Sequence, residues 1–154
     1  DITPDNYEER ITDLIGVRIL HLFKEDWVNI HDFITETWEL KETPKAYVRK
    51  GDREEVINLF KQKECRVENH KYGYRSVHYL VKSQPSKDLN VTEVQVRTLF
   101  EEGWSEIDHR TRYPYYRENT ALLTQSRILN GLAGSADEMG SVINGLKREI
   151  DNKG

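Results

Sequence analysis

The sequence predicts an α+β domain in which a mixed β-sheet of four or five strands is flanked by helices and followed by a helical C-terminal end. Strand-like segments rich in apolar and β-branched residues alternate along the chain with segments whose apolar residues recur at helical spacing. The chain has 154 residues, of which 36% are hydrophobic and 32% charged. This length and composition are typical of a single globular domain, here expected over 1–154, with a core of its own.

The first half of the chain is expected to form two strands and two helices. Residues 14–23 are almost continuously apolar, which predicts a strand buried on both faces of the sheet. Aromatic and aliphatic side chains recur at helical spacing over 25–38 and predict a helix. A second strand is expected over 38–48, broken at Pro44, and a second helix over 53–63.

Two further segments alternate most clearly between apolar and polar residues. They span residues 76–82 and 91–98 and are separated by a polar turn, which predicts two strands. In the second segment, Glu93, Gln95 and Arg97 share one face. Three such side chains do not belong in a core, so we expect this face to meet water or a functional site.

The rest of the chain is predicted to be helical. Residues 99–112 form one expected helix, in which the spacing of Trp104 and Ile107 places both in the core. Within 101–116, aromatic side chains also gather with arginines, which are equally compatible with a solvated helix face. From residue 119 to about residue 151, glycines at positions 131, 134, 140 and 145 indicate two helices or one bent helix.

Charge and cysteine content disfavour several classes of protein. The 23 basic and 27 acidic residues give a formal net charge of −4, which argues against electrostatic capture of nucleic acid or an anionic membrane by the whole domain. The single cysteine, Cys65, cannot form an internal disulfide, and no Cys/His spacing suggests structural zinc. No apolar run is long enough to span a membrane, and no secretory signal is visible. We therefore expect a soluble cytoplasmic domain.

Two carboxylates are candidates for a metal site. Asp13 directly precedes the first strand, and Glu93 lies inside a later one. If the strands are neighbours, these groups form a hard-oxygen site suited to Mg²⁺ and to metal-assisted phosphoryl transfer. Spacing alone favours a solvated turn residue at Asp13, and at Glu93 it leaves a surface ion pair with Arg97 and a functional role about equally balanced.

The segment KYGYRSVH over residues 71–78 is a candidate nucleotide-binding element. Two tyrosines flank Gly73, which permits close approach of a ligand to the backbone. An exposed tyrosine stacks well on a base, and Lys71, Arg75 and His78 are suitable groups for phosphate contacts. A turn with one tyrosine anchored in the core would explain the same pattern.

Several blocks of the sequence, taken together and in order, resemble the RelA/SpoT alarmone synthetase domain, especially its short single-domain members. The blocks are ITDLIGVRI (11–19), GYRSVHYLV (73–81), EVQVRT (93–98), WSEIDHRTRY (104–113) and LNGLAGSADEMGS (129–141). The resemblance implies a nucleotidyltransferase-like fold. It also implies transfer of pyrophosphate from ATP to the 3′-hydroxyl of GTP or GDP, the reaction that makes (p)ppGpp in stringent-response signalling.

The resemblance also implies roles for individual residues. Asp13 would hold Mg²⁺, and Glu93 would assist the metal or take the proton of the acceptor. Tyr74 would stack on the acceptor guanine, and His78 would lie near its phosphates. The remaining candidates for binding the acceptor nucleotide are Lys71, Arg75, Gln95 and Arg97.

Two departures from the family pattern qualify these expectations. Residues 1–10 carry one arginine and four acids where family members have a basic ATP-binding segment, so we expect a chain that lacks this segment. These 154 residues would then bind an acceptor but transfer pyrophosphate poorly. His70 and Tyr72 stand where relatives carry Lys and Asn, which leaves other acceptors open: an adenine nucleotide or the 3′ end of tRNA.

Two expectations concern the function and assembly of the whole domain. A non-catalytic regulatory domain that binds nucleotides remains the alternative to an enzyme. A homo-oligomer is expected because the short members of the family often assemble.

Overall fold

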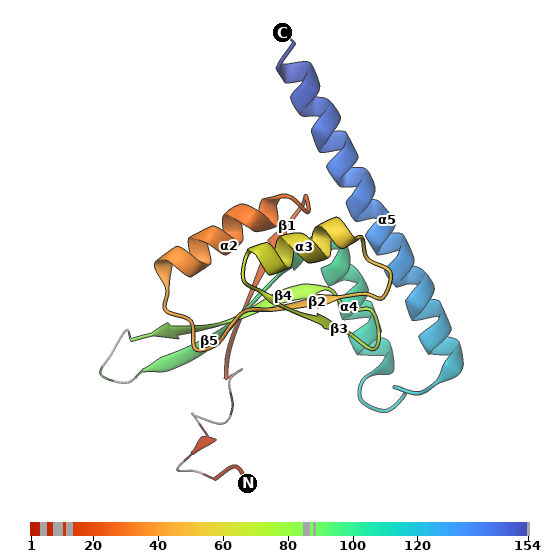
Figure 1. Ribbon diagram of the computed structural model, residues 1–154. Coiled ribbons are helices and arrows are strands. Elements are labelled where there is room, and N and C mark those ends of the chain that lie inside the picture. The colour runs from red at the N-terminus through yellow and green to blue at the C-terminus, as the bar shows by residue number, and fades with distance from the viewer. Residues whose placement is uncertain (4–5, 8–10, 12–13, 85–86, 88, 154) are drawn as a thin grey trace.

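The computed structural model describes the chain except for residues 4–5, 8–10, 12–13, 85–86, 88 and 154. In chain order, the elements are β1 (Ile15–His21), α2 (Asp26–Thr37), β2 (Lys45–Val48), α3 (Glu54–Gln62), β3 (Arg66–Asn69), β4 (Ser76–Ser83), β5 (Asn90–Thr98), α4 (Leu99–Arg112) and α5 (Thr120–Asp151) (Figure 1). The α+β class and the helical C-terminal end are therefore confirmed.

The strands form one mixed sheet in the order β1-β5-β4-β2-β3. The pairs β1/β5 and β2/β3 are parallel, whereas β5/β4 and β4/β2 are antiparallel. The sheet thus has five strands, where the sequence predicts four or five. The strand missed by the sequence pattern is β3, whose four residues RVEN at the edge of the sheet show almost no apolar signal.

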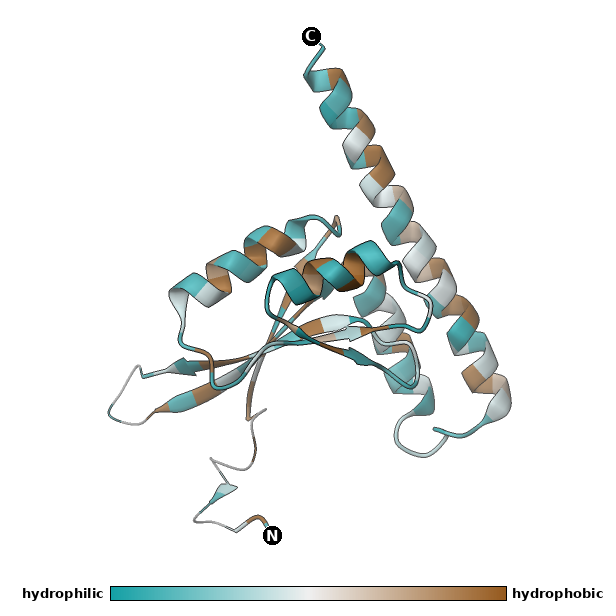
Figure 2. Ribbon diagram, viewed as in Figure 1, coloured by the Kyte–Doolittle hydropathy of each residue, from teal (hydrophilic) through white to brown (hydrophobic). Residues whose placement is uncertain are grey.

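Helices α2 and α3 cover one face of the sheet, and α4 and α5 lie beyond one of its ends (Figure 1). Hydrophobic residues recur along α2 and α3 and along the full length of α5 (Figure 2). The covered face holds the core, whose burial provides the main driving force for folding. The buried core residues are Trp27, Ile34, Ala46, Cys65, Val77, Tyr79, Val81, Val94 and Val96.

Two expectations about strands are wrong. Strand β1 is not buried on both faces: it lies at the edge of the sheet, and Ile15, Val17 and Leu20 are 44–46% exposed. An apolar run signals a strand but carries no information about its position in the sheet. The second expected strand is shorter than its pattern, because Leu40 makes only an isolated bridge to Val81 before β2 begins at Lys45.

One alternative about the helices is decided, and one expectation is wrong. Of the two alternatives for 119–151, the structure shows a single helix, α5, whose 32 residues include all four glycines. Trp104 is buried as expected, but Ile107, nearly one turn further along α4, is 52% exposed. Despite the length of α5, no helix in the described part of the chain is long and apolar enough to cross a membrane.

Candidate functional site

The face of the sheet opposite the core carries a row of polar side chains, which we call the polar face. On β5, Glu93, Gln95 and Arg97 alternate with the core residues Val94 and Val96. On the neighbouring strands, the register sets Arg18 and His78 on either side of Gln95, with Lys45 next in the row. The side-chain period of a strand thus gathers polar groups distant in sequence on one surface.

Glu93 is the centre of a hydrogen-bonded chain on this face. Its Oε1 lies 3.0 Å from His78 Nδ1, and its Oε2 accepts a 2.7 Å hydrogen bond from Gln95 Nε2. Since a carboxylate only accepts, His78 donates through Nδ1, and its Nε2 is left to accept from the Tyr74 hydroxyl at 3.1 Å. Gln95 Oε1 in turn accepts a hydrogen bond from Arg97. These hydrogen bonds fix the orientation of the Glu93 carboxylate.

His78, which contacts Glu93, and Tyr74, which contacts His78, are both neutral at physiological pH. Burial lowers the pKa of His78, and the nearby Glu93 carboxylate only partly offsets this effect. Burial also raises the pKa of Tyr74, so its phenol keeps its proton. A carboxylate that neutral donors hold in one orientation is suited to accept a proton or bind a cation.

Two arginines add positive charge to the polar face. The Arg97 guanidinium lies over the Tyr74 ring, 4.9 Å from its centroid, and pairs with Glu102 at 3.1 Å. Arg18, which the sequence analysis did not select, pairs with Glu102 at 2.8 Å and Glu106 at 2.7 Å, and half of its side chain is exposed. The sequence did contain a signal for Arg18, because it is a charged residue in the middle of a largely apolar strand.

A cavity of about 340 Å³ lies between the turn before β4 and the second half of α4. Arg112 forms two hydrogen bonds to Asp108, of 2.6 and 2.7 Å, and its guanidinium lies 4.5 Å from the centroid of the Tyr72 ring. Aromatic rings beside arginines are typical of sites that stack bases and contact phosphates. The residues with aromatic or imidazole rings that line this cavity are His70, Tyr72, Tyr74, Trp104, His109 and Tyr113.

The turn that presents Tyr74 is fixed from two sides. Gly73 has a φ of +79°, a conformation that side chains rarely adopt, and a Cβ there would lie 3.1 Å from Asn130 Oδ1. Asn130 donates to the Gly73 carbonyl at 3.0 Å, so α5 holds this turn. His70 Nδ1 accepts from the Tyr74 amide at 3.3 Å, and burial lowers the pKa of His70. His70 therefore acts within the turn as a neutral acceptor.

The structure does not bring every predicted site residue to the polar face. Asp13 lies outside the described residues. Lys71 is exposed, pairs with Glu118 at 3.3 Å and lies 4.9 Å from the centroid of the Tyr72 ring, beside the aromatic cavity rather than on the sheet.

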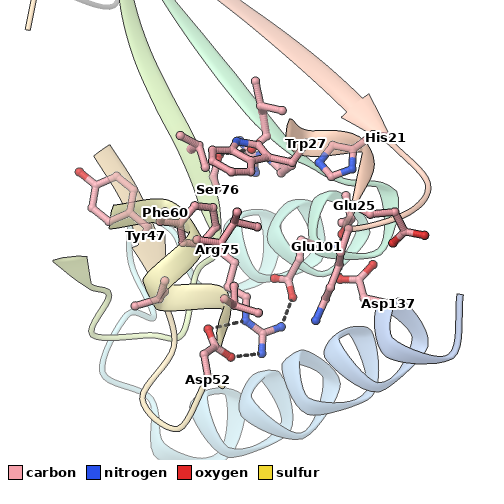
Figure 3. A pocket seen from close by; sticks show the side chains of 18 of the residues that line it. His21, Glu25, Trp27, Tyr47, Asp52, Phe60, Arg75, Ser76, Glu101 and Asp137 are labelled. Atoms are coloured by element: carbon pink, nitrogen blue, oxygen red, sulfur yellow. Dashed lines mark hydrogen bonds and ion pairs between the residues drawn. The ribbon is translucent and has the colours of Figure 1, made fainter. Parts of the chain in front are cut away.

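Arg75 points to the other side of the sheet. Its guanidinium pairs with Asp52 and Glu101, each at 2.6 Å, and only 14% of its side chain is exposed (Figure 3). Side chains alternate between the two faces as the chain enters β4, so Tyr74 and Arg75 separate. The sequence pattern grouped them because they are adjacent, whereas the fold divides them.

The polar face fits a magnesium ion that takes some of its oxygen ligands from a bound nucleotide. The described residues contain no group of three or more His, Cys, Asp or Glu that could hold a metal by itself. Mg²⁺ commonly binds one or two carboxylates and takes its other oxygens from phosphates and water. Glu93 supplies one carboxylate, and its register partner Gly16 leaves the β1 side open, since a Cβ there would meet nothing within 4 Å.

Comparisons with known proteins agree with this fold. The chain is 24% identical over 155 residues to GTP pyrophosphokinase YwaC of Bacillus subtilis (strain 168), covering 98% of this chain and 65% of the relative, slightly less than two thirds of its length. A crystal structure of smu.1046c from Streptococcus mutans UA159 has a TM-score of 0.71 and 21% identity, covering 97% of this chain and 70% of that one.

Small alarmone synthetase 1 from Bacillus subtilis, in a structure bound to its product pppGpp, has a TM-score of 0.66 and 20% identity over 96% of this chain and 69% of that one. The same synthetase bound to AMPCPP has a TM-score of 0.64 and 20% identity, covering 95% of this chain and 67% of that one. The sequence model of a family described as a region found in RelA / SpoT proteins matches residues 2–118. The chain therefore belongs to the RelA/SpoT family.

Proposed function

We propose that this chain transfers pyrophosphate from ATP to the 3′-hydroxyl of GTP or GDP and so makes (p)ppGpp. The observation that carries the proposal is the oriented Glu93 carboxylate, which lies on the polar face beside an aromatic cavity. Family membership and the relatives that are named for this activity or bound to its nucleotides support it.

In this proposal, the acceptor base enters the aromatic cavity and stacks on Tyr74, and its 3′-hydroxyl reaches Glu93. Glu93 accepts the hydroxyl proton while the hydroxyl oxygen forms a bond to the β-phosphorus of ATP. The bond from that phosphorus to the bridging oxygen of the α-phosphate breaks, and AMP leaves with the electron pair. His78 and Gln95 hold the carboxylate in place throughout this step.

The ATP phosphates require positive charge. We propose that Glu93 and Asp13 hold Mg²⁺, whose charge, when it is bound, would offset the negative charge that gathers on the phosphate oxygens. Arg18 and Arg97 are two of the cations of the polar face, and we propose that they flank this position. Arg75 is left out of the proposed site because its guanidinium lies on the other side of the sheet, between Asp52 and Glu101.

The residues around the aromatic cavity favour a nucleotide as the acceptor but do not determine how many phosphates it carries. Gln95 is within reach of Tyr74, and Lys71, Arg112 and Arg117 supply cations around the aromatic cavity. His70 is committed to the turn rather than to a phosphate. GTP and GDP are the proposed acceptors, and an adenine nucleotide or a tRNA 3′ end would reveal itself in the same assay.

We also propose that the protein is a homo-oligomer. In its C-terminal half, α5 exposes a run of apolar side chains at helical spacing, and this part of the helix extends past the rest of the fold (Figure 1). These residues are Met139, Val142, Ile143, Leu146 and Ile150, each between 55% and 71% exposed. Light scattering after size exclusion measures the mass directly.

The test is a transfer assay with ATP labelled in its terminal phosphates, Mg²⁺ and a panel of GTP, GDP, ATP and tRNA. We expect label on GTP or GDP and none when EDTA removes the metal. Label on tRNA or an adenine nucleotide alone would replace the acceptor and keep the chemistry. Nucleotide binding without transfer to any acceptor, in the longest available form of the protein, would support the regulatory domain instead.

A further inference from the structure

A second cavity, of about 270 Å³, lies on the helix-covered side of the sheet. Its walls are mainly apolar and come from α2, α3 and the inward side of β4 and β5, through Trp27, Phe60, Val77 and Val96. Figure 3 shows these walls with charged side chains gathered toward α5. A pocket with an apolar body and a few polar groups at one end is the usual form of a small-molecule site.

The polar end of the cavity contains two carboxylates with unused hydrogen-bonding capacity. Glu101 and Asp137 are only 2% and 1% exposed. One Glu101 oxygen pairs with Arg75 at 2.6 Å, and one Asp137 oxygen accepts from Thr98 at 2.9 Å. Within the described residues, the other oxygen of each carboxylate has no hydrogen-bond partner. Such buried orphan acceptors are rare, because leaving them unpaired costs free energy.

The charges at this end do not balance. Arg75 lies among Asp52, Glu101 and Asp137, three acidic groups that line the same cavity (Figure 3). Arg49 adds a second guanidinium, 3.9 Å from Asp52. With all three ionised, the end of the cavity has an excess of negative charge.

The nearest cations at the mouth do not supply the missing donors. Lys24 pairs with Glu138 at 2.5 Å, and Arg53 approaches the same carboxylate at 3.7 Å. Neither donates a hydrogen bond to the two orphan oxygens. A ligand that enters the cavity could therefore supply a donor for the free oxygens of Glu101 and Asp137.

We propose that this cavity binds an organic monocation, an amine or amidine on a small hydrocarbon body. Its nitrogen would donate to the free oxygens of Glu101 and Asp137, and its hydrocarbon part would pack against Trp27 and Phe60. A bare metal ion fits less well, since the described residues offer no three-ligand cluster and the walls are apolar.

Protonation gives the site a distinctive signature. Burial raises the pKa of Glu101 to about 7, with Arg75 opposing this effect, and burial also raises the pKa of Asp137. A cation binds the ionised carboxylates, so it must displace any proton they hold. Affinity is therefore expected to increase as pH rises through about 7 and to level off above it.

The experiment is calorimetric titration of the nucleotide-free protein with benzamidine, and with benzamide as the neutral molecule of nearly the same shape. The variants are Glu101→Gln and Asp137→Asn, which keep shape and remove charge. The control is Glu54→Gln, the same change on an exposed residue of α3 outside the cavity. Thermal unfolding verifies that each variant is folded.

We expect benzamidine to bind at least about tenfold more tightly than benzamide, and each cavity variant to lose at least about tenfold in affinity. Glu54→Gln should bind as the wild type does. Equal binding of the two probes, no benzamidine binding at millimolar concentration, or unchanged affinity in both cavity variants would overturn the proposal. If a variant fails to fold, the comparison of benzamidine with benzamide on the wild-type protein still tests the proposal. Because no nucleotide is present, either outcome leaves the proposed transfer reaction untouched.

Discussion

Two tyrosine–histidine pairs lie on opposite sides of the sheet and share the same kind of hydrogen bond but not the same surroundings. On the polar face, the Tyr74 hydroxyl is 3.1 Å from His78 Nε2, beside Glu93 and the aromatic cavity. On the covered face, the Tyr79 hydroxyl is 3.1 Å from His31 Nδ1, and Tyr79 is fully buried. One pair can meet a ligand, and the other can only hold the core together.

The difference teaches that a residue's role here follows from its face of the sheet more than from its chemistry. Glu93 and Val94 are adjacent on β5, yet one belongs to the proposed site and the other to the core. Substitutions on the two faces should therefore separate activity from stability. The expected effects below run from the largest to the smallest.

Glu93→Gln should lower pyrophosphate transfer by roughly 10²- to 10⁴-fold, the usual contribution of a general base. The amide keeps the shape of the side chain but cannot accept the proton. The free energy of unfolding should change little, because the residue lies outside the core. Steady-state transfer and urea unfolding measure both, with Glu36→Gln on the exposed side of α2 as the control. Turnover near that of the wild type would remove Glu93 from the mechanism.

Tyr74→Ala should weaken acceptor binding by roughly ten- to a hundredfold, as expected from the loss of one base–aromatic stack. Tyr72→Ala is the matched control, because Tyr72 lines the same cavity but contacts Arg112 and Glu118 instead of His78. Calorimetry with GDP gives both constants. The assignment would be reversed by a large loss at Tyr72 with no effect at Tyr74.

Tyr79→Phe should act on stability instead. It removes the hydroxyl that Trp27 Nε1 and His31 contact at 3.1 Å and leaves these buried groups without that partner. The expected loss is about 1–3 kcal/mol in the free energy of unfolding, measured by urea denaturation. GDP affinity of the folded variant should stay the same. A variant with full stability and impaired GDP binding would contradict the division between the faces.

Glu101 should give a smaller effect, which depends on pH. Its pKa is raised by burial from 4.5 to about 7, with Arg75 and Arg49 opposing and Asp137 adding to the rise. The folded state then holds more protons than the unfolded state in this range, so the free energy of unfolding should fall as pH rises from about 4.5 to about 7. Glu101→Gln should flatten this part of the curve. An unchanged pH profile would mean that Glu101 is ionised throughout.

The sequence predicted the elements with strong periodicity and the face that the polar residues on them share. The alternation in β4 and β5 placed Glu93, Gln95 and Arg97 on one face, and the structure shows that His78 joins them. Local patterns could not predict β3, which lacks an apolar signal, or the edge position of β1, which depends on the order of strands across the sheet.

The parts of the site that the sequence did not predict come from tertiary contacts. Arg18 joins the polar face through the pairing of β1 with β5, and Glu102 reaches it from α4. Arg75 leaves it because Asp52 and Glu101 lie on the other side. No spacing in the sequence encodes these long-range pairings, so adjacency in the chain was a poor guide to adjacency in space.

The most direct test of the division between the faces is a GDP titration followed by NMR of the tyrosine and histidine side chains. The two tyrosine–histidine pairs act as internal controls for each other in one sample. We expect the resonances of Tyr74 and His78 to shift with added GDP, while those of Tyr79 and His31 stay unchanged. Shifts confined to Tyr79 and His31 would place nucleotide binding on the covered side and contradict the account.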